Sequence, residues 1–183
     1  MAGVRVLERV TAAAPWLLVA LPAGAFVVDR GLARILPAPA RGLEMRVEIA
    51  APVQAVWDIT ADIGRQPEWM REMKSVRILT PGPIGVGTRG EATVRIFGIS
   101  VNDPVVVTGW RPPHEFAIAH GGLFSGGGRI TLREGVPGTT ILEWHEELVP
   151  PLLASLGSLV QWPILHWIFQ DDLYRLRDLI EHS

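Results

Sequence analysis

The sequence predicts an α+β domain in which a curved antiparallel sheet wraps around one long C-terminal helix. Three observations carry this prediction. A strand pattern followed by a short helix opens the domain over 47–70, and about six further strand patterns come after it. The third is a helix pattern over 152–181 that is too apolar to lie on a surface. Such an arrangement leaves room for a pocket between sheet and helix.

The composition fits one domain of ordinary size with an extension. Of 183 residues, 48% are hydrophobic and 20% are charged, so the chain can bury a core and is not dominated by disorder. The net charge of -2 provides no basic surface, so no nucleic-acid partner is predicted. The absence of cysteine excludes disulfides, thiolate metal ligands and thiol catalysis. Seven tryptophans need large apolar surroundings, which a roomy interior would supply.

The chain divides near 37–42, where the sequence PAPARG breaks any regular structure. We therefore assign 1–42 to an N-terminal hydrophobic helical extension with a Pro/Ala linker, and 43–183 to the domain. The extension carries five arginines against two carboxylates, so it is basic while the domain is acidic. The two parts therefore face different surroundings.

Residues 11–28 carry no charge, whereas a membrane-spanning helix needs about 20 apolar residues. Pro15 and Pro22 would weaken a helix in water, although helices in lipid tolerate them. Three interpretations stay open: a membrane anchor or interfacial segment, a hydrophobic arm packed on the domain, and a cleaved signal peptide. Arginines are slightly more frequent after the segment than before it. This favours membrane association with a cytoplasmic domain; the alternative is a soluble cytoplasmic protein.

The opening strand and helix are both amphipathic. Apolar and charged residues alternate over 44–49, which is the period of a half-buried strand. Pro52 then opens a helix that turns Trp57 inward. The loop after this helix ends in Pro-Glu-Trp, and Asp62 within it is most simply a capping residue.

The following strands are separated by short turns, which predicts hairpins and antiparallel order. Gly98 predicts a hairpin turn, and Pro104 predicts a bulge or an edge position in its strand. The predicted strands cover 73–79, 88–97, 99–110, 114–120, 128–133 and 139–148.

The closing helix changes character along its length. Over 152–169 it is apolar nearly all round, so it must be buried, gripped by the sheet or in contact with lipid. Pro163 should kink it. From 170 onwards the pattern is amphipathic, with leucines inward and charged residues, Asp172 among them, outward.

Residues 47–79 (VEIAAPVQAVWDITADIGRQPEWMREMKSVRIL) resemble the opening of the polyketide cyclase/dehydrase group of the SRPBCC superfamily, also called START-like or Bet v 1-like. Val86-Gly87, the Trp110-x-Pro-Pro motif, Gly138-Thr-Thr before Trp144 and the ending DDLYRLRDLIE resemble it too. The resemblance covers 43–181. It implies a helix-grip fold with a hydrophobic cavity between sheet and long helix. Family members include lipid and sterol carriers, coenzyme-Q-binding proteins, aromatic cyclases, plant hormone binders and chaperone activators.

Glu146 is the first candidate for chemistry. Strand alternation places it on one face with Leu142 and Trp144. If that face lines the cavity, its carboxyl group could act as a general acid or base. Alternatively, Glu146 lies at the strand end in water.

His120 is the second candidate, because it shares a strand face with Phe116 and Ile118. It could be a pocket donor, or it could line the pocket without catalysing anything. The tryptophans could be core residues as readily as walls of a ligand site. The predicted ligand-binding residues are Trp57, Trp69, Trp110, Phe116, Ile118, Leu142, Trp144, Val160, Ile164 and Trp167.

Neither a metal nor a cofactor is predicted. The five histidines lack the spacing of a metal-binding helix pair, and no carboxylate cluster accompanies them. Glycines at 121–122 and 126–128 predict a flexible hairpin at the pocket mouth; no Lys-Ser/Thr follows them, as a phosphate-binding loop would need.

The leading functional hypothesis is a carrier or sequestering protein for a hydrophobic small molecule, such as a lipid, quinone, polyketide or isoprenoid. The alternative is a polyketide cyclase or dehydratase that uses Glu146 and His120 as acid and base. A protein-interaction module like the heat-shock ATPase activators is a third class. The ligand and the oligomeric state do not follow from the sequence.

Overall fold

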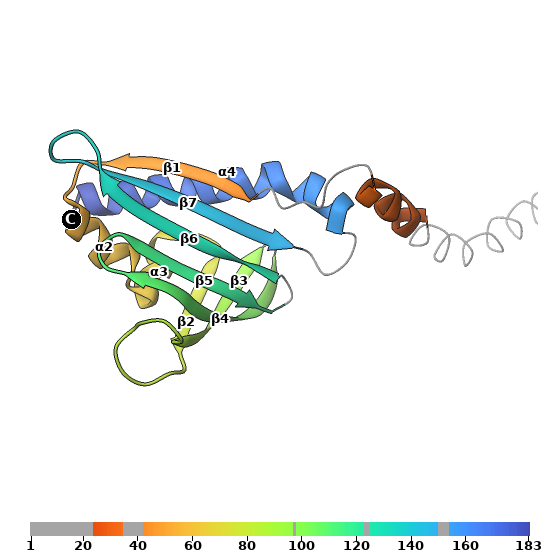
Figure 1. Ribbon diagram of the computed structural model, residues 1–183, viewed down its shortest axis with the longest axis horizontal. Helices are drawn as coiled ribbons and strands as arrows, with labels where there is room; N and C mark the ends of the chain where they lie inside the picture. Colours follow the sequence, from red (N-terminus) through yellow and green to blue (C-terminus); the bar gives the residue numbers. More distant parts are fainter. Residues whose placement is uncertain (1–23, 35–41, 97, 123–124, 150–153) are drawn as a thin grey trace, which may run out of the picture.

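In the computed structural model, which describes residues 24–34, 42–96, 98–122, 125–149 and 154–183, a seven-stranded antiparallel sheet curves around one long helix (Figure 1). The strand order is β1-β7-β6-β5-β4-β3-β2. The predicted α+β architecture is confirmed. In chain order the elements are β1 (Leu43–Ile49), α2 (Val53–Thr60), the 3-10 helix η1 (Ile63–Arg65), α3 (Gln66–Trp69), β2 (Met73–Ile78), β3 (Arg89–Ile96), β4 (Ile99–Arg111), β5 (Glu115–Gly121), β6 (Ser125–Glu134), β7 (Thr140–Val149) and α4 (Ala154–Glu181).

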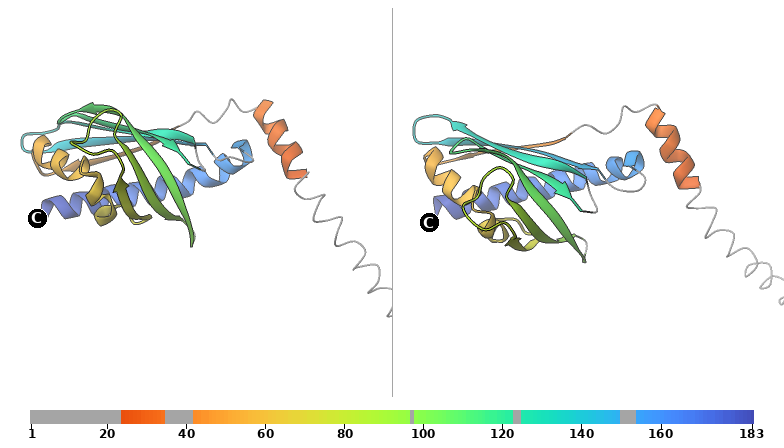
Figure 2. Two further views of the ribbon diagram at one scale, coloured as in Figure 1. Left: turned by 90° about the horizontal axis from the view of Figure 1, so that it is seen from below. Right: turned by 60° about the horizontal axis from the view of Figure 1, so that its bottom comes forward.

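Helix α4 lies against one face of the sheet, and α2 and α3 close one end of the space between them (Figure 2). Strand β1 shows why the sheet packs this way: its residues are alternately buried and exposed, with Ile49 completely buried. The leucines in the second half of α4 meet this face, and Leu173 and Leu176 are completely buried. Apolar burial of this kind stabilises the domain by about 25 cal/mol per Å².

The end of the sheet near α2 is filled by aromatic rings. Trp57 of α2 lies 5.0 Å from Trp110 of β4 in an edge-to-face contact, and Trp110 lies 5.7 Å from Phe116 of β5. Asp62 accepts a hydrogen bond from the Gly64 N–H (3.0 Å), so its predicted capping role is confirmed.

Strand β4 pairs with a strand on each side, β3 and β5. Its pairing with β5 contains a register shift, which does not fall at Pro104. Gly98 has a φ of 82° at the β3–β4 turn, as the predicted hairpin requires. The register shift with β5 falls between Val107 and Gly109. Pro104 pairs with Glu91 of β3, one residue beyond the last β4–β5 pair, so it has a partner strand on only one side. The proline therefore takes a local edge position and not a bulge.

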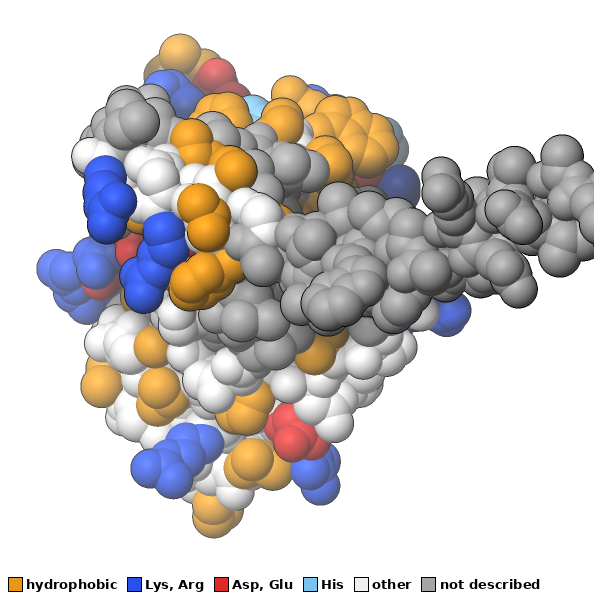
Figure 3. All heavy atoms as spheres, turned by 90° about the vertical axis from the view of Figure 1, so that its right-hand side faces the viewer, with side chains coloured by type: hydrophobic (Ala, Val, Ile, Leu, Met, Phe, Trp, Pro, Cys, Tyr) orange, Lys and Arg blue, Asp and Glu red, His pale blue; other side chains and the backbone are white. Residues whose placement is uncertain are grey.

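The first half of α4 is not buried all round, which corrects the sequence interpretation. Trp162 and Trp167 are 45% and 64% exposed, and Figure 3 shows apolar side chains at the surface of this end of the molecule. Leu165 and Phe169 are buried. The sheet covers only one side of the helix, so the opposite side remains at the surface whatever its composition.

Residues 24–34 of the extension form a helix. The linker and most of the uncharged segment 11–28 lie outside the described residues. Within the part of the chain that the structure describes, no helix is long and apolar enough to cross a bilayer. Attachment of the extension to a membrane stays a prediction.

Candidate functional site

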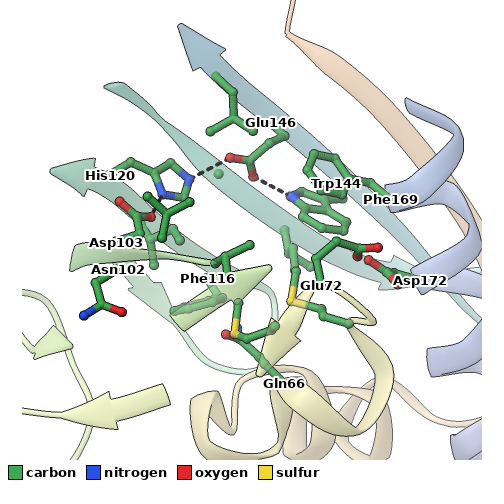
Figure 4. A pocket seen from close by; sticks show the side chains of 18 residues that line it. Gln66, Glu72, Asn102, Asp103, Phe116, His120, Trp144, Glu146, Phe169 and Asp172 are labelled. Atoms are coloured by element: carbon green, nitrogen blue, oxygen red, sulfur yellow. Dashed lines mark hydrogen bonds and ion pairs between the residues drawn. The ribbon is translucent and has the colours of Figure 1, made fainter. Parts of the chain in front are cut away.

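A cavity of about 130 Å³ lies between the sheet and α4 (Figure 4). Its walls come from α3, β2 to β7 and α4. Among the described residues, ten apolar side chains and several polar ones face it. The apolar ones are Met70, Met73, Val94, Val101, Phe116, Ile118, Ile130, Trp144, Leu148 and Phe169; the polar ones are Gln66, Glu72, Asn102, Asp103, His120, Glu146 and Asp172.

Three charged side chains on the sheet wall form a hydrogen-bonded chain, which we call the ion cluster: Asp103 of β4, His120 of β5 and Glu146 of β7. His120 Nε2 lies 2.7 Å from Glu146 Oε1, and His120 Nδ1 lies 2.5 Å from Asp103 Oδ2. The Trp144 indole N–H donates to Glu146 Oε2 (2.8 Å), and the Gly122 N–H donates to Asp103 Oδ1 (3.1 Å). Every carboxylate oxygen of the ion cluster therefore has at least one partner.

The carboxylates keep His120 positively charged. Burial alone would lower the pKa of this imidazole, but hydrogen bonds to Asp103 and Glu146, together with their charges, outweigh it and raise the pKa to about 10. At neutral pH the ring is an imidazolium that donates from both nitrogens. One cation between two carboxylates leaves the ion cluster with one net negative charge.

Glu146 reaches this position because of strand alternation and a glycine opposite it. Only 4% of Glu146 is exposed, on the same face as Leu142 and Trp144, so it does not lie at a strand end in water. Its partner on β6 is Gly128. A Cβ at Gly128 would collide with Glu146 Oε2, so the carboxylate occupies the space that a side chain would fill.

Gly128→Ala is therefore expected to push Glu146 away from Trp144 and to lower the free energy of unfolding by about 1–3 kcal/mol. Chemical denaturation would measure the loss. Gly90→Ala on β3 is the matched control, because a Cβ there has no neighbour nearer than 3.4 Å among the described residues. Equal losses in both variants would mean that the Glu146 site is not the cause.

Opposite the ion cluster, Glu72 and Asp172 form a second acidic group, which we call the carboxyl pair. Asp172 is 1% exposed, and its Oδ1 accepts a hydrogen bond from the Arg71 N–H (3.0 Å). Asp172 Oδ2 and Glu72 Oε2 are buried, and no donor among the described residues reaches either of them. Burial raises the pKa of Asp172 to about 8; the Arg71 N–H opposes this effect and Glu72 adds to it. One proton shared by the two groups fits this geometry.

The burial of Asp172 corrects its predicted outward position. It lies three residues after Phe169 and four before Leu176, on the buried side of α4. The period of the helix could have revealed this, because i+3 and i+4 neighbours share a face. Asp172 was predicted to point outward because it is charged.

The predicted site residues divide into three groups. Glu146, His120, Phe116, Ile118 and Trp144 line the cavity together. A second group is buried or packed in the core without lining it, because these side chains contact other parts of the core: Trp57, Trp69, Trp110 and Leu142.

The third group lies on α4, and its described side chains, those of Ile164 and Trp167, are turned away from the cavity. Ile164 is 38% exposed and Trp167 64% exposed, because the sheet packs on the other side of the helix. The side chain of Val160 lies outside the described residues. Among the α4 side chains that the structure describes, those of Phe169 and Asp172 face the cavity.

A family model described as "Polyketide cyclase / dehydrase and lipid transport" matches residues 41–181. The chain belongs to this family. The resemblance seen in residues 47–79 is thereby confirmed, and a hydrophobic ligand or a cyclase reaction is consistent with it. Comparison with curated proteins found no match.

Solved structures share the fold. The Zhui aromatase/cyclase from Streptomyces sp. R1128 is 17% identical, with a TM-score of 0.60 over 77% of this chain and 93% of its own. A START superfamily protein from Mycobacterium smegmatis is 20% identical, with a TM-score of 0.57 over 77% and 94%. A protein from Thermus thermophilus is 20% identical, with a TM-score of 0.59 over 75% and 96%. These likenesses show a helix-grip fold, and a shared fold does not identify the ligand.

Proposed function

We propose that this protein binds an apolar small molecule in the cavity and serves as its carrier or sequestering protein. The observation that carries the proposal is the cavity of about 130 Å³ between sheet and α4, with ten apolar side chains on its walls. Protein interiors are normally close-packed, and a mostly apolar cavity with a few placed polar groups is the usual form of a ligand site. A lipid, quinone, polyketide or isoprenoid would bring the apolar surface that such walls bind.

The ion cluster favours binding over acid–base catalysis by His120. A catalytic imidazole needs a free nitrogen within reach of the substrate and a pKa near the working pH. Both nitrogens of His120 are engaged with carboxylates, and the pKa is raised to about 10. The ion cluster is better suited to hold the polar end of a ligand than to move its protons.

Filling the cavity tests the proposal. Ile118→Trp places a bulky ring in the cavity and is expected to weaken binding of N-phenyl-1-naphthylamine, a neutral apolar fluorophore, by about tenfold or more. The increase in dye fluorescence on binding to the full-length protein measures the affinity. Ile78→Trp is the matched control, because Ile78 is a strand isoleucine at the surface, outside the cavity lining.

Thermal unfolding of both variants separates a blocked cavity from a damaged fold. A wild-type protein that refuses the dye, or equal binding by the two tryptophan variants, would overturn the proposed function. Native mass spectrometry of the purified protein gives a second readout, since a carrier is expected to retain an apolar molecule.

A cyclase or dehydratase is the second candidate, and the carboxyl pair favours it. A carboxyl group whose pKa is raised to about 8 can hold or release a proton near neutral pH, and Asp172 faces the cavity. Glu146 and His120 would then position the substrate. With an aromatic polyketide as substrate, Asp172→Asn is expected to reduce turnover by about 10²-fold or more. Unchanged turnover would remove the carboxyl pair from the reaction.

A further inference from the structure

Most of the polar side chains on the cavity walls are acidic; the neutral ones are the amides of Gln66 and Asn102. Four carboxyl groups line the cavity, and His120 is the sole basic side chain among the described residues that line it. Arg71 and Arg175 lie near Asp172, but neither of them lines the cavity, and Arg71 forms an ion pair with Asp171 outside it. With one negative charge on the ion cluster and one on the carboxyl pair, the cavity is anionic at neutral pH.

The carboxyl pair also has hydrogen-bonding capacity that the described residues do not use. Asp172 is 1% exposed and lines the cavity, yet its Oδ2 has no donor within the described part of the chain, and the same holds for Glu72 Oε2. Figure 4 shows the two carboxyl groups turned toward each other beside Trp144 and Phe169, with the ion cluster on the other side of Trp144. A shared proton would occupy one lone pair on each oxygen. Buried polar groups usually have at least one partner, and each of these oxygens keeps a further lone pair that a donor group of a ligand can use.

These charges discriminate between ligands by the chemistry of their polar ends. A carboxylate or phosphate would enter a poorly solvated space beside like charges, where repulsion is much stronger than in water. A hydroxyl group would donate to a lone pair that lacks a partner, and an ammonium group would add a charge-assisted hydrogen bond. Specificity of this kind depends on repelling the wrong partner as much as on attracting the right one.

We propose that the ligand is an apolar molecule whose polar ends are hydrogen-bond donors, hydroxyl or ammonium groups, and that the cavity excludes carboxylates and phosphates. The inference rests on the proposed function and narrows its ligand. It removes free fatty acids and phosphate-bearing isoprenoids, and it retains alcohols, phenols and amines with an apolar body.

Three competitors that share one apolar ring system test the inference on the full-length protein. They are 2-naphthol, 2-naphthylmethylamine and 2-naphthoate, each used to displace N-phenyl-1-naphthylamine at pH 7. We expect the alcohol and the amine to displace the dye at concentrations about tenfold or more below that of the carboxylate. Displacement by naphthoate as effective as that by naphthol would overturn the inference and leave the proposed function standing. Failure of the dye to bind at all would instead overturn the proposed function.

Replacing the carboxyl pair by amides tests its contribution. Glu72→Gln combined with Asp172→Asn removes the charge with little change in shape, and the carbonyl of the new asparagine can still accept from the Arg71 N–H. Naphthoate affinity is expected to rise about tenfold, and the affinity for the amine is expected to fall relative to that for naphthol. Glu68→Gln combined with Asp171→Asn is the matched control, because these carboxylates are exposed and paired with Arg65 and Arg71. Equal shifts in both double variants would show that general charge, and not the cavity, sets the preference.

Discussion

His120→Leu is expected to lower the free energy of unfolding by about 3–5 kcal/mol, because it leaves two carboxylates in the core without their cation. Glu146 is 4% exposed and the Asp103 side chain 18% exposed, so bulk water has little access to replace the lost hydrogen bonds. Leucine fills a similar volume, so the loss reports the charge and not a cavity. Urea denaturation near pH 6 would measure it.

His145→Leu is the matched control for this prediction. His145 also lies between two carboxylates, with Nδ1 2.5 Å from Glu44 and Nε2 3.2 Å from Glu147, but 39% of its side chain is exposed. Ion pairs in water are worth about 0–1 kcal/mol, so this variant should change stability little. Comparable losses in the two variants would contradict the assigned role of the ion cluster.

Neutralising the stranded carboxylates should restore stability. A triple variant that adds Asp103→Asn and Glu146→Gln to His120→Leu keeps oxygen acceptors for the Gly122 and Trp144 N–H groups while removing both charges. It is expected to recover at least half of the loss, because similar apolar or neutral replacements of buried ion clusters are often tolerated. If the triple variant recovers none of the lost stability, the loss in His120→Leu comes from the changed shape of the side chain and not from its charge.

The stabilisation by His120 also has a defined dependence on pH. Its pKa is about 10 in the folded protein and 6.5 for an unperturbed imidazole, so the folded state holds more protons between these values. The contribution is complete below pH 6.5 and is lost as the pH rises through 10. His120→Leu should remove this part of the stability profile.

The fold could be predicted because its signals are local. The alternation over β1 and the proline that opens α2 depend on neighbours in the chain, and both were interpreted correctly. Alternation also placed Glu146 beside Trp144 on the inner face of β7. The exposed face of α4 at Trp167 could not be predicted, because apolar composition does not reveal which side of a helix the sheet will cover.

The candidate site could be predicted only in part because its contacts join distant strands. Strand faces indicated His120 and Glu146 separately, but their hydrogen bond depends on the sheet register and on the missing side chain at Gly128. Asp103 had no sequence signal, since its contact with His120 is set by the β4–β5 pairing. The helical period of α4 places Asp172 on the buried side, but the charge of the residue led to the opposite prediction.

Removing the buried carboxyl group of Asp172 is expected to stabilise the folded protein. Asp172→Asn is expected to raise the free energy of unfolding at pH 7 by about 2–4 kcal/mol, because the folded protein no longer has to keep a buried carboxyl group protonated. The asparagine carbonyl can accept from the Arg71 N–H, and its amide can donate to Glu72 Oε2 in place of the proton that Asp172 and Glu72 share in the wild type. Asp171→Asn is the control, because Asp171 is paired with Arg71 at the surface.

The pH profile decides whether the carboxyl pair causes this gain. The pKa of Asp172 is raised from 3.8 to about 8, so the folded state holds the extra proton in that window and wild-type stability falls as the pH rises through it. Below about pH 4 both states are protonated, so wild type and Asp172→Asn should then differ little. The gain should grow with pH up to about 8 and then level off. A gain independent of pH would assign the effect to packing, and a loss at pH 7 would show that Asp172 is ionised and stabilising in the folded protein.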